Sequence, residues 1–274
     1  MATQETRKDT HWSRPAALTA FLLGTTLIAS ADADTRIRGG EPAVVGEFPF
    51  IVELQVFVEE DQRWLTSCTA SLADPRAILT AAHCIPGVIP GSDPQIPVRL
   101  IFNRVSDDDA IQDVVTESQI ERIIWNPEFG AFPHRDLAVI VLKTPNTTTP
   151  PVTLPEPHGR PALGASITAA GWGTTNNAAD PRWLRKVDIP VVPCVPVSDY
   201  LCAGVSGIGV GKGDSGGPGF VRHPDGTFIQ YGVVSGISLS PDMISGYTDL
   251  SSPDVWRAIS EDLKATGLEH LVRR

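Results

Sequence analysis

The chain has 274 residues, of which 42% are hydrophobic and 20% charged, a composition typical of a folded globular protein and not of a disordered chain or a coiled coil. Its 32 acidic residues outnumber its 22 Lys and Arg residues, and the resulting net charge of −10 argues against a dedicated nucleic-acid-binding protein, because such a protein carries a basic face. The 24 glycines and 24 prolines favour short strands and turns over long helices.

The first residues have the pattern of an export signal. Basic residues precede an apolar run from Ala16 to Ala29, and small residues follow this run. The run is shorter than the roughly 20 apolar residues that span a bilayer, so a cleaved signal peptide is preferred to a membrane anchor. We expect cleavage after Ala31 or Ala33, and a mature protein that is secreted to the extracellular side and is not bound to a membrane.

The four cysteines fit an oxidising compartment. Their spacing does not form the paired pattern of a zinc site, so no metal is expected. Three connectivities are possible for four cysteines. We expect the pairing that is local in sequence, Cys68 with Cys84 and Cys194 with Cys202.

Short segments that are apolar or alternate in polarity recur along the chain between turn residues, which predicts an all-β protein. The expected strands are Phe50–Val58, Ala77–Thr80, Val98–Phe102, Leu137–Leu142, Ala165–Ala170 and Gln230–Val234. The stretch 144–157 is rich in proline and threonine and is predicted to be a linker between two halves of domain size. It contains the glycosylation sequon Asn146-Thr147-Thr148, for which we prefer the plain linker interpretation because no glycosylating host is indicated.

The C-terminal segment has the pattern of one helix. Ser252 can cap its start and Pro253 occupies the first helical position. Val255, Ile259 and Leu263 then fall on one face, which we expect to be buried.

Four patches could carry chemistry. His83 stands directly beside Cys84, and Asp136 opens an apolar strand, where a carboxylate is costly to bury unless it is hydrogen-bonded, for instance to an imidazole. The segment Gly171-Trp172-Gly173 is a weaker marker. The segment Gly213–Pro218 places a serine among glycines that leave the backbone N–H groups accessible. Each patch alone is a weak signal.

The glycine-rich patch also matches two other motifs. Residues 211–216 fit the G-x-G-x-x-G pattern of dinucleotide-binding proteins, but Pro218 would disrupt the helix which that motif requires. The same patch fits the nucleophile elbow of α/β-hydrolases, which needs the order Ser, Asp, His and again a helix at Pro218. The residues that this hydrolase alternative would use are Ser215, Asp242 or Asp254, and His270.

Taken together, the patches resemble the chymotrypsin/trypsin-like family of serine endopeptidases, whose catalytic residues also come in the order His, Asp, Ser. The resemblance runs from Ile37 to the C-terminal helix, and it implies two antiparallel Greek-key β-barrels with the active site between them. The segments that carry it are Ile37-Arg38-Gly39-Gly40, Thr80-Ala81-Ala82-His83-Cys84, Asp136-Leu137-Ala138, Gly171-Trp172-Gly173 and Gly213-Asp214-Ser215-Gly216-Gly217-Pro218.

The resemblance also implies a domain organisation. A short propeptide would follow the signal peptide, and the linker would join the two barrels. The expected segments are a signal peptide 1–31, a propeptide 32–36, a first barrel 37–143, a linker 144–157, a second barrel 158–251, and a C-terminal helix and tail 252–274.

By the same resemblance, Ser215 attacks the scissile carbonyl, His83 accepts and returns its proton, and Asp136 holds the imidazole. The backbone N–H groups of Gly213 and Ser215 would form the oxyanion hole. No cofactor is implied. The expected partners are protein or peptide substrates, with no nucleic acid, and the expected state is a monomer.

Activation would follow cleavage after Arg36, because the new α-amino group of Ile37 would then pair with Asp214 and order the specificity pocket. Gly209 stands at the pocket floor in place of the acid of trypsins, so a Lys or Arg side chain of the substrate would enter without a countercharge. The enzyme is therefore expected to need a separate activating protease that cleaves after arginine.

The remaining pocket positions predict cleavage after small or medium apolar residues. Val210 adds an apolar wall, while Ser235, Ile237 and Ser245 resemble wall positions and narrow the pocket. A deeper, chymotrypsin-like pocket remains the alternative.

Two further alternatives concern function. Residues 107–109 are three aspartates in the loop where relatives sometimes bind calcium, and we prefer a solvated acidic loop because charge runs are usually solvated. The chain could also be a non-catalytic homologue that keeps the fold as a binding protein, but such proteins usually lose a catalytic residue, and His83, Asp136 and Ser215 are all present.

Overall fold

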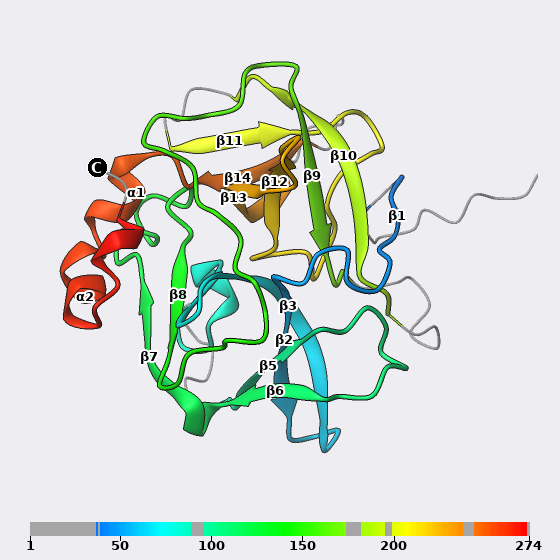
Figure 1. The fold of residues 1–274 in the computed structure, drawn as a ribbon, viewed down its shortest axis with the longest axis vertical. Helices are drawn as coiled ribbons and strands as arrows, with labels where there is room; N and C mark the ends of the chain where they lie inside the picture. Colours follow the sequence, from blue (N-terminus) through cyan, green and yellow to red (C-terminus); the bar gives the residue numbers. More distant parts are fainter. Residues whose placement is uncertain are drawn as a thin grey trace, which may run out of the picture. The chain divides into compact units, whose positions relative to one another are not determined.

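Two seven-stranded antiparallel sheets form the body of the protein, seen here in a computed structural model (Figure 1). The structure describes residues 37, 39–88, 96–173, 182–194, 199–237 and 244–272, which all belong to one compact unit. The first sheet contains β2 (Ile51–Val58), β3 (Arg63–Asp74), β4 (Ala77–Thr80), β5 (Val98–Phe102), β6 (Asp113–Thr116), β7 (Ile120–Trp125) and β8 (Ala138–Leu142). The second contains β1 (Glu41–Pro42), β9 (Ser166–Gly171), β10 (Arg185–Val192), β11 (Tyr200–Ala203), β12 (Pro218–Arg222), β13 (Phe228–Ile237) and β14 (Ser245–Asp249).

The strand orders confirm the expected all-β class with two barrel-like sheets. The first sheet runs β6-β5-β2-β3-β4-β8-β7, and the second runs β1-β10-β11-β14-β13-β12-β9 with a further pairing of β9 to β10 that closes it. The short helices of the described residues are η1 (Ala82–Cys84), η2 (Glu117–Gln119), α1 (Pro253–Arg257), α2 (Ser260–Ala265) and η3 (Glu269–Leu271). None of the helices in these ranges is long and apolar enough to cross a membrane.

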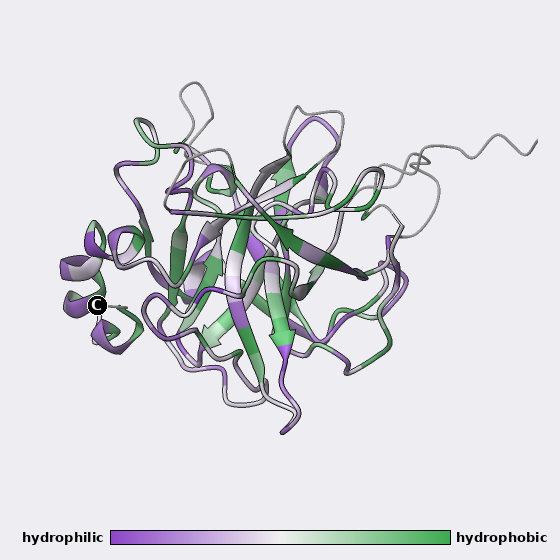
Figure 2. Cartoon of the chain, turned by 90° about the horizontal axis from the view of Figure 1, so that it is seen from above, coloured by the Kyte–Doolittle hydropathy of each residue, from purple (hydrophilic) through white to green (hydrophobic). Residues whose placement is uncertain are grey.

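Buried apolar strands hold each sheet together. All five residues of β8 are buried between β4 and β7, which is why this segment reads as a continuous run of Ala, Val, Ile and Leu. Figure 2 shows long hydrophobic stretches, in green, along the strands. Four phenylalanines then join the two halves of the chain. Their ring centroids lie 5.0 Å apart for Phe48 and Phe220, and 5.3 Å for Phe50 with both Phe220 and Phe228.

Both disulfides are the ones predicted from the sequence. Cys68 is bonded to Cys84, and Cys194 to Cys202. The segment between β8 and β9 is attached to both sheets, because the N–H of Val152 donates to the carbonyl of Leu72 in β3 and the N–H of Thr153 to the carbonyl of Phe228 in β13.

The single C-terminal helix that the sequence predicts is divided in two. Ile259 leaves the helical conformation, with φ −114° and ψ 4°, so α1 and α2 are separate. The hydroxyl of Ser252 does not cap α1 but donates to Asp199 at 2.7 Å. Val255, Ile259 and Leu263 are all buried as predicted. The break falls at Ile259, a β-branched residue with only a modest helix propensity. Burial of this face therefore outweighs the continuity of the helix.

Thr69 of β3 links the two sheets by hydrogen bonds. Its side chain is buried, its Oγ1 accepts from the N–H of Trp172 at 2.8 Å and donates to the carbonyl of Gly213 at 3.0 Å, and its own N–H donates to the carbonyl of Ser215 at 2.8 Å. A residue of the first sheet thus fixes two segments of the second.

We expect Thr69→Val to lower the free energy of unfolding by roughly 1–3 kcal/mol, because it leaves the buried N–H of Trp172 without its acceptor. Denaturant titration measures the change. Thr144→Val is the matched control, since Thr144 is exposed. Equal stability of the two variants would contradict this role of Thr69.

Candidate active site

A one-turn helix positions His83. This helix, η1, follows the buried strand β4, and the disulfide from Cys84 ties it back to Cys68 in β3. Ala81 and Ala82 are fully buried beside it, whereas 24% of the His83 side chain stays exposed. The imidazole is thus held on a rigid support and remains accessible from solvent.

The carboxylate of Asp136 holds His83 at two points. Asp136 immediately precedes β8 and its side chain is buried. Its Oδ1 accepts from the backbone N–H of His83 at 2.9 Å, and its Oδ2 lies 2.5 Å from His83 Nδ1. Because Nδ1 faces the carboxylate, its proton is held there, and Nε2 is left as the basic nitrogen of the ring.

A third partner of this carboxylate carries no signal in the sequence. The hydroxyl of Ser235, in β13, donates to Asp136 Oδ2 at 2.9 Å, and the backbone carbonyl of Asp136 accepts from the hydroxyl of Thr248 in β14 at 3.1 Å. Ser235 is predicted from the sequence as a pocket residue, and the structure shows that its hydroxyl faces the buried acid. The apolar residues that flank Ser235 in the sequence gave no signal of this contact.

A glycine turn places Ser215 against the strand that leads to His83. Gly216, next to the serine, has φ +79°, and a Cβ there would lie 2.1 Å from Thr80 Oγ1 and 2.4 Å from the carbonyl oxygen of Thr69. Only glycine permits this close approach. The turn is fixed further by the N–H of Gly216, which donates to the carbonyl of Val234 at 2.8 Å.

Glycines from two segments of the chain surround the carboxylate of Asp214. The N–H of Gly173 donates to its Oδ1 at 2.9 Å and the N–H of Gly211 to its Oδ2 at 2.7 Å. A Cβ on Gly171 would lie 2.4 Å from Oδ1, which explains the glycines on both sides of Trp172. The carboxylate is fully buried, and this burial raises its pKa to about 7, although the two N–H donors and the charge of Arg185 act in the opposite direction.

Ile37 lies in the apolar core of the second sheet. Its side chain is only 1% exposed and belongs to the same cluster as Val210 and Tyr247. Arg36 and Arg38 lie outside the described residues.

The predicted pocket residues come together in part. Gly209 and Val210 are buried, and the N–H of Val210 donates to the hydroxyl of the buried Ser245 at 3.1 Å. The backbone of Ile237 pairs with Ser245, while its side chain and residues 238–243 lie outside the described part of the structure.

The hydrolase alternative is not assembled. Nε2 of His270 lies 2.9 Å from Asp74 Oδ2, and Asp254 forms an ion pair with Arg257, so neither side chain is directed at Ser215. Asp242 lies outside the described residues.

Two of the three aspartates at 107–109 bind groups of neighbouring residues in the same loop. Asp107 Oδ1 lies 2.9 Å from the guanidinium of Arg104, and Asp109 Oδ2 accepts from the N–H groups of Val105 and Ser106 at 3.0 and 2.8 Å.

Within the described ranges, His83 and the two cysteines Cys68 and Cys84 form the single cluster with metal-ligand spacing. Their sulfurs are joined in a disulfide, so they cannot act as thiolate ligands.

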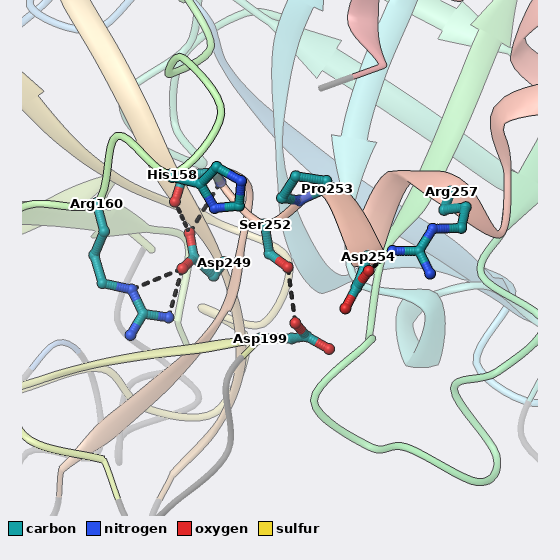
Figure 3. A pocket seen from close by; sticks show the side chains of 9 residues that line it. His158, Arg160, Asp199, Asp249, Ser252, Pro253, Asp254 and Arg257 are labelled. Carbon is teal, nitrogen blue, oxygen red and sulfur yellow. Dashed lines mark hydrogen bonds and ion pairs between the residues drawn. The ribbon is translucent and has the colours of Figure 1, made fainter. Parts of the chain in front are cut away.

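A separate cavity of about 650 Å³ lies beside α1 (Figure 3). Its charged groups are paired with one another: Arg160 with Asp249 at 2.5 Å, and Asp254 with Arg257. Asp199 on its wall also accepts from Arg135 at 3.0 Å. Since Arg135 directly precedes Asp136 in the chain, this wall supports the segment that carries the buried acid.

Two antiparallel barrel-like sheets, with a histidine–carboxylate pair on one and a glycine-flanked serine on the other, are the arrangement of a serine endopeptidase. The family model for trypsin matches residues 37–255. The chain belongs to the trypsin family.

Curated relatives agree with this assignment. The chain is 32% identical over 227 residues to CLIP domain-containing serine protease B4 of Anopheles gambiae, covering 73% of this chain and 62% of that protein, so it spans less than two thirds of that relative. It is 30% identical over 249 residues to serine protease 28 of Mus musculus, covering 80% of this chain and 87% of that protein. A trypsin-like protease of Streptomyces glaucescens is 30% identical over 252 residues, 85% of each chain.

The buried Asp214 predicts a pH-dependent stability of the uncleaved chain. Its folded-state pKa of about 7 lies above the ordinary value of 3.8, so the unfolded state loses this proton first as pH rises. Stability from this group is therefore present below about pH 4 and lost between about pH 4 and 7. The loss reaches about 4 kcal/mol, at 1.36 kcal/mol per pKa unit.

The measurement compares denaturant unfolding of Ser215→Ala with that of Ser215→Ala/Asp214→Asn, both uncleaved. Between pH 4 and 7 the double variant should gain stability relative to the single one. A difference that does not change with pH would refute the raised pKa of Asp214.

Proposed function

We propose that this chain is a secreted serine endopeptidase that hydrolyses peptide bonds through Ser215, His83 and Asp136. The observation that supports this most is the double contact of Asp136 with the backbone and the imidazole of His83, at 2.9 and 2.5 Å. This contact directs Nε2 of His83 away from the acid, where a general base for a serine hydroxyl is needed.

The reaction has two halves. In the first, Ser215 Oγ attacks the scissile carbonyl carbon while Nε2 of His83 takes the hydroxyl proton, and the C–N bond then breaks as His83 returns the proton to the leaving amine. In the second, water attacks the acyl-enzyme, gives its proton to His83, and Ser215 is released with its hydroxyl restored. The N–H groups of Gly213 and Ser215 are the proposed donors to the oxyanion, and Gly213, at φ +89°, supplies the unusual backbone conformation.

Secretion and activation belong to the same proposal. The signal peptide would be removed after residue 31 or 33, and cleavage after Arg36 would free the amine of Ile37. Asp214, buried without a side-chain cation on its oxygens in the described residues, is the group that this amine would neutralise. The mature enzyme is proposed to act as a monomer on proteins or peptides, with no cofactor and no nucleic-acid or membrane partner.

We expect Ser215→Ala and His83→Ala each to reduce amidase turnover by roughly 10⁴- to 10⁶-fold while the fold is kept, because these residues act as a unit. Peptide-amide hydrolysis and titration with a serine-directed organophosphate measure this. Ser206→Ala, in an exposed turn, is the control. A wild-type chain that shows neither turnover nor titration would instead be a non-catalytic homologue.

The pocket predicts cleavage after Ala, Val or Leu. Gly209 supplies no carboxylate, and the proposed wall residues Val210 and Ser245 are buried, with the N–H of Val210 donating to the hydroxyl of Ser245. A peptide library that varies the residue before the cleaved bond measures the preference. Faster hydrolysis after Arg or Lys would contradict the pocket assignment, and a preference for Phe or Tyr would indicate the deeper pocket.

Activation should depend on a second protease. The purified precursor, incubated alone, is expected to stay inactive, because the bond after Arg36 requires a pocket that accepts arginine. A trace of trypsin should yield an N-terminus that starts at Ile37, and activity should rise with it. Self-processing at Arg36 that increases with protein concentration and is lost in Ser215→Ala would contradict this.

A further inference from the structure

A buried ion pair lies in the first sheet. Glu53 of β2 is 0% exposed, and its Oε1 accepts from the hydroxyl of Thr66 and from the amide of Gln55, each at 2.5 Å. Its Oε2 lies 3.2 Å from Nη1 of Arg104, whose side chain is also buried. A charge removed from water in this way is tolerated only where its partners satisfy it, so the two side chains depend on each other.

The guanidinium of Arg104 also holds the loop that follows β5. Its Nε donates to the carbonyl of Ser106 at 2.7 Å, and its Nη2 to Asp107 Oδ1 at 2.9 Å. With Nη1 directed at Glu53, each nitrogen of the planar group has an acceptor. One side chain therefore fixes residues 104–109, called the Arg104 loop below, to β2.

The Arg104 loop is bonded to the segment that leads into β10. The N–H of Leu184 donates to the carbonyl of Val105 at 2.8 Å, and the N–H of Asp107 donates to the carbonyl of Arg182 at 2.9 Å. The guanidinium of Arg182 donates to the carbonyl of Thr66 at 3.0 Å. The segment before β10, residues 182–184, is thus held by the loop and by the strand that also binds Glu53.

This segment supports the chain that follows Ile37. The carbonyl of Leu184 accepts from the N–H of Ala43 at 2.8 Å, and β1 pairs with the first two residues of β10. The guanidinium of Arg185 donates to the carbonyl of Gly40. Ile37 itself is buried in the second core. The amine side of the proposed activation pair is therefore anchored, through β1, on the segment that the Arg104 loop holds.

The acid side of the same pair is reached through Trp172. The guanidinium carbon of Arg104 lies 5.9 Å from the centroid of the Trp172 ring, within the range of a cation–π interaction. The ring is buried, and its Nε1 has no hydrogen-bond partner among the described residues. Gly173, the next residue, donates its N–H to Asp214 Oδ1 at 2.9 Å. Arg104 thus contacts the ring directly before one of the two N–H donors to the buried acid.

We infer that Arg104 is a positioning residue of the proposed protease, which holds the segments that carry Ile37 and Asp214 and so favours the active conformation of the cleaved chain. This inference rests on the proposed function. Groups that are held in place before they meet lose less conformational freedom when they pair. Loss of Arg104 therefore lowers the population of the active conformation, while the residues that carry out the reaction stay unchanged.

The test is Arg104→Met in the activated enzyme, with rates expressed per titrated active site. We expect KM to rise about 3- to 10-fold with kcat little changed, because substrate binds the active conformation and its apparent affinity falls with the populated fraction. Arg99→Met is the matched control. Arg99 also lies near Glu53, but its guanidinium binds Gln55 at 2.8 Å and lies 4.5 Å from the Trp64 ring.

The pH profile gives a second measure of the same effect. A free α-amino group titrates at about pH 8, and pairing with the carboxylate of Asp214 raises its pKa. The active conformation is present below this raised pKa and is lost as pH rises through it. A weaker pair lowers the pKa, so the alkaline limb of kcat/KM should move down by about half a unit to one unit in Arg104→Met. Arg185, the cation whose charge acts on Asp214, is retained in every variant.

A second variant separates positioning from folding. Arg104→Met leaves Glu53 buried without its cation, which destabilises the folded chain. Glu53→Gln/Arg104→Met removes both charges, and the amide at position 53 can still accept from Thr66. We expect this double variant to fold and to show the same rise in KM and the same shift of the alkaline limb, because the Arg104 loop still lacks its guanidinium.

Two outcomes would overturn the inference and leave the proposed function intact. The first is a double variant whose KM and alkaline limb equal those of Arg99→Met, whatever its stability in denaturant. The second is a fall in kcat alone. An activated wild-type chain that is not titrated by an organophosphate would refute the proposed function itself, and this result is distinct from both.

Discussion

The buried carboxylate of Asp136 is the group on which the junction of the two sheets depends. A carboxylate removed from water needs partners, and these come from two elements of different sheets: the backbone N–H and imidazole of His83 from η1, which follows β4, and the hydroxyl of Ser235 from β13. Its backbone carbonyl adds a bond from Thr248 of β14. Displacing either sheet would leave this carboxylate or its donors unpaired, so the requirement to satisfy one charge sets the relative position of several strands.

On the other side of the junction between the two sheets, glycines allow the close approaches that the site requires. Gly216 lets the serine turn approach Thr80 and Thr69 more closely than any side chain allows, and Gly171 and Gly173 leave space for the carboxylate of Asp214. Both approaches bring backbone N–H groups to a carbonyl or a carboxylate. These three glycines therefore stand where the second sheet contacts the first or encloses a buried charge.

A second set of contacts supports the junction on the side of the cavity beside α1. Arg135, next to Asp136 in the chain, donates from its Nε to Asp199 at 3.0 Å. Asp199 also accepts from Ser252 at the start of α1. The wall of the cavity beside α1 and the site therefore share one hydrogen-bonded framework, and this explains why Ser252 is used to bind an acid and not to cap its own helix.

The sequence by itself determined the fold class, both disulfides and the bounds of β4 and β5, because these follow from local polarity patterns, turn residues and cysteine spacing. The order of His83, Asp136 and Ser215 was also readable, since each stands in a short distinctive segment. The tertiary structure alone decided the roles of Thr69 and Ser235, whose partners are distant in the chain and whose neighbours in sequence carry no motif. It also decided the break at Ile259, where burial of one face against the core outweighed helix continuity. Local patterns record what a segment prefers, whereas a hydrogen bond across two sheets exists only once both have folded.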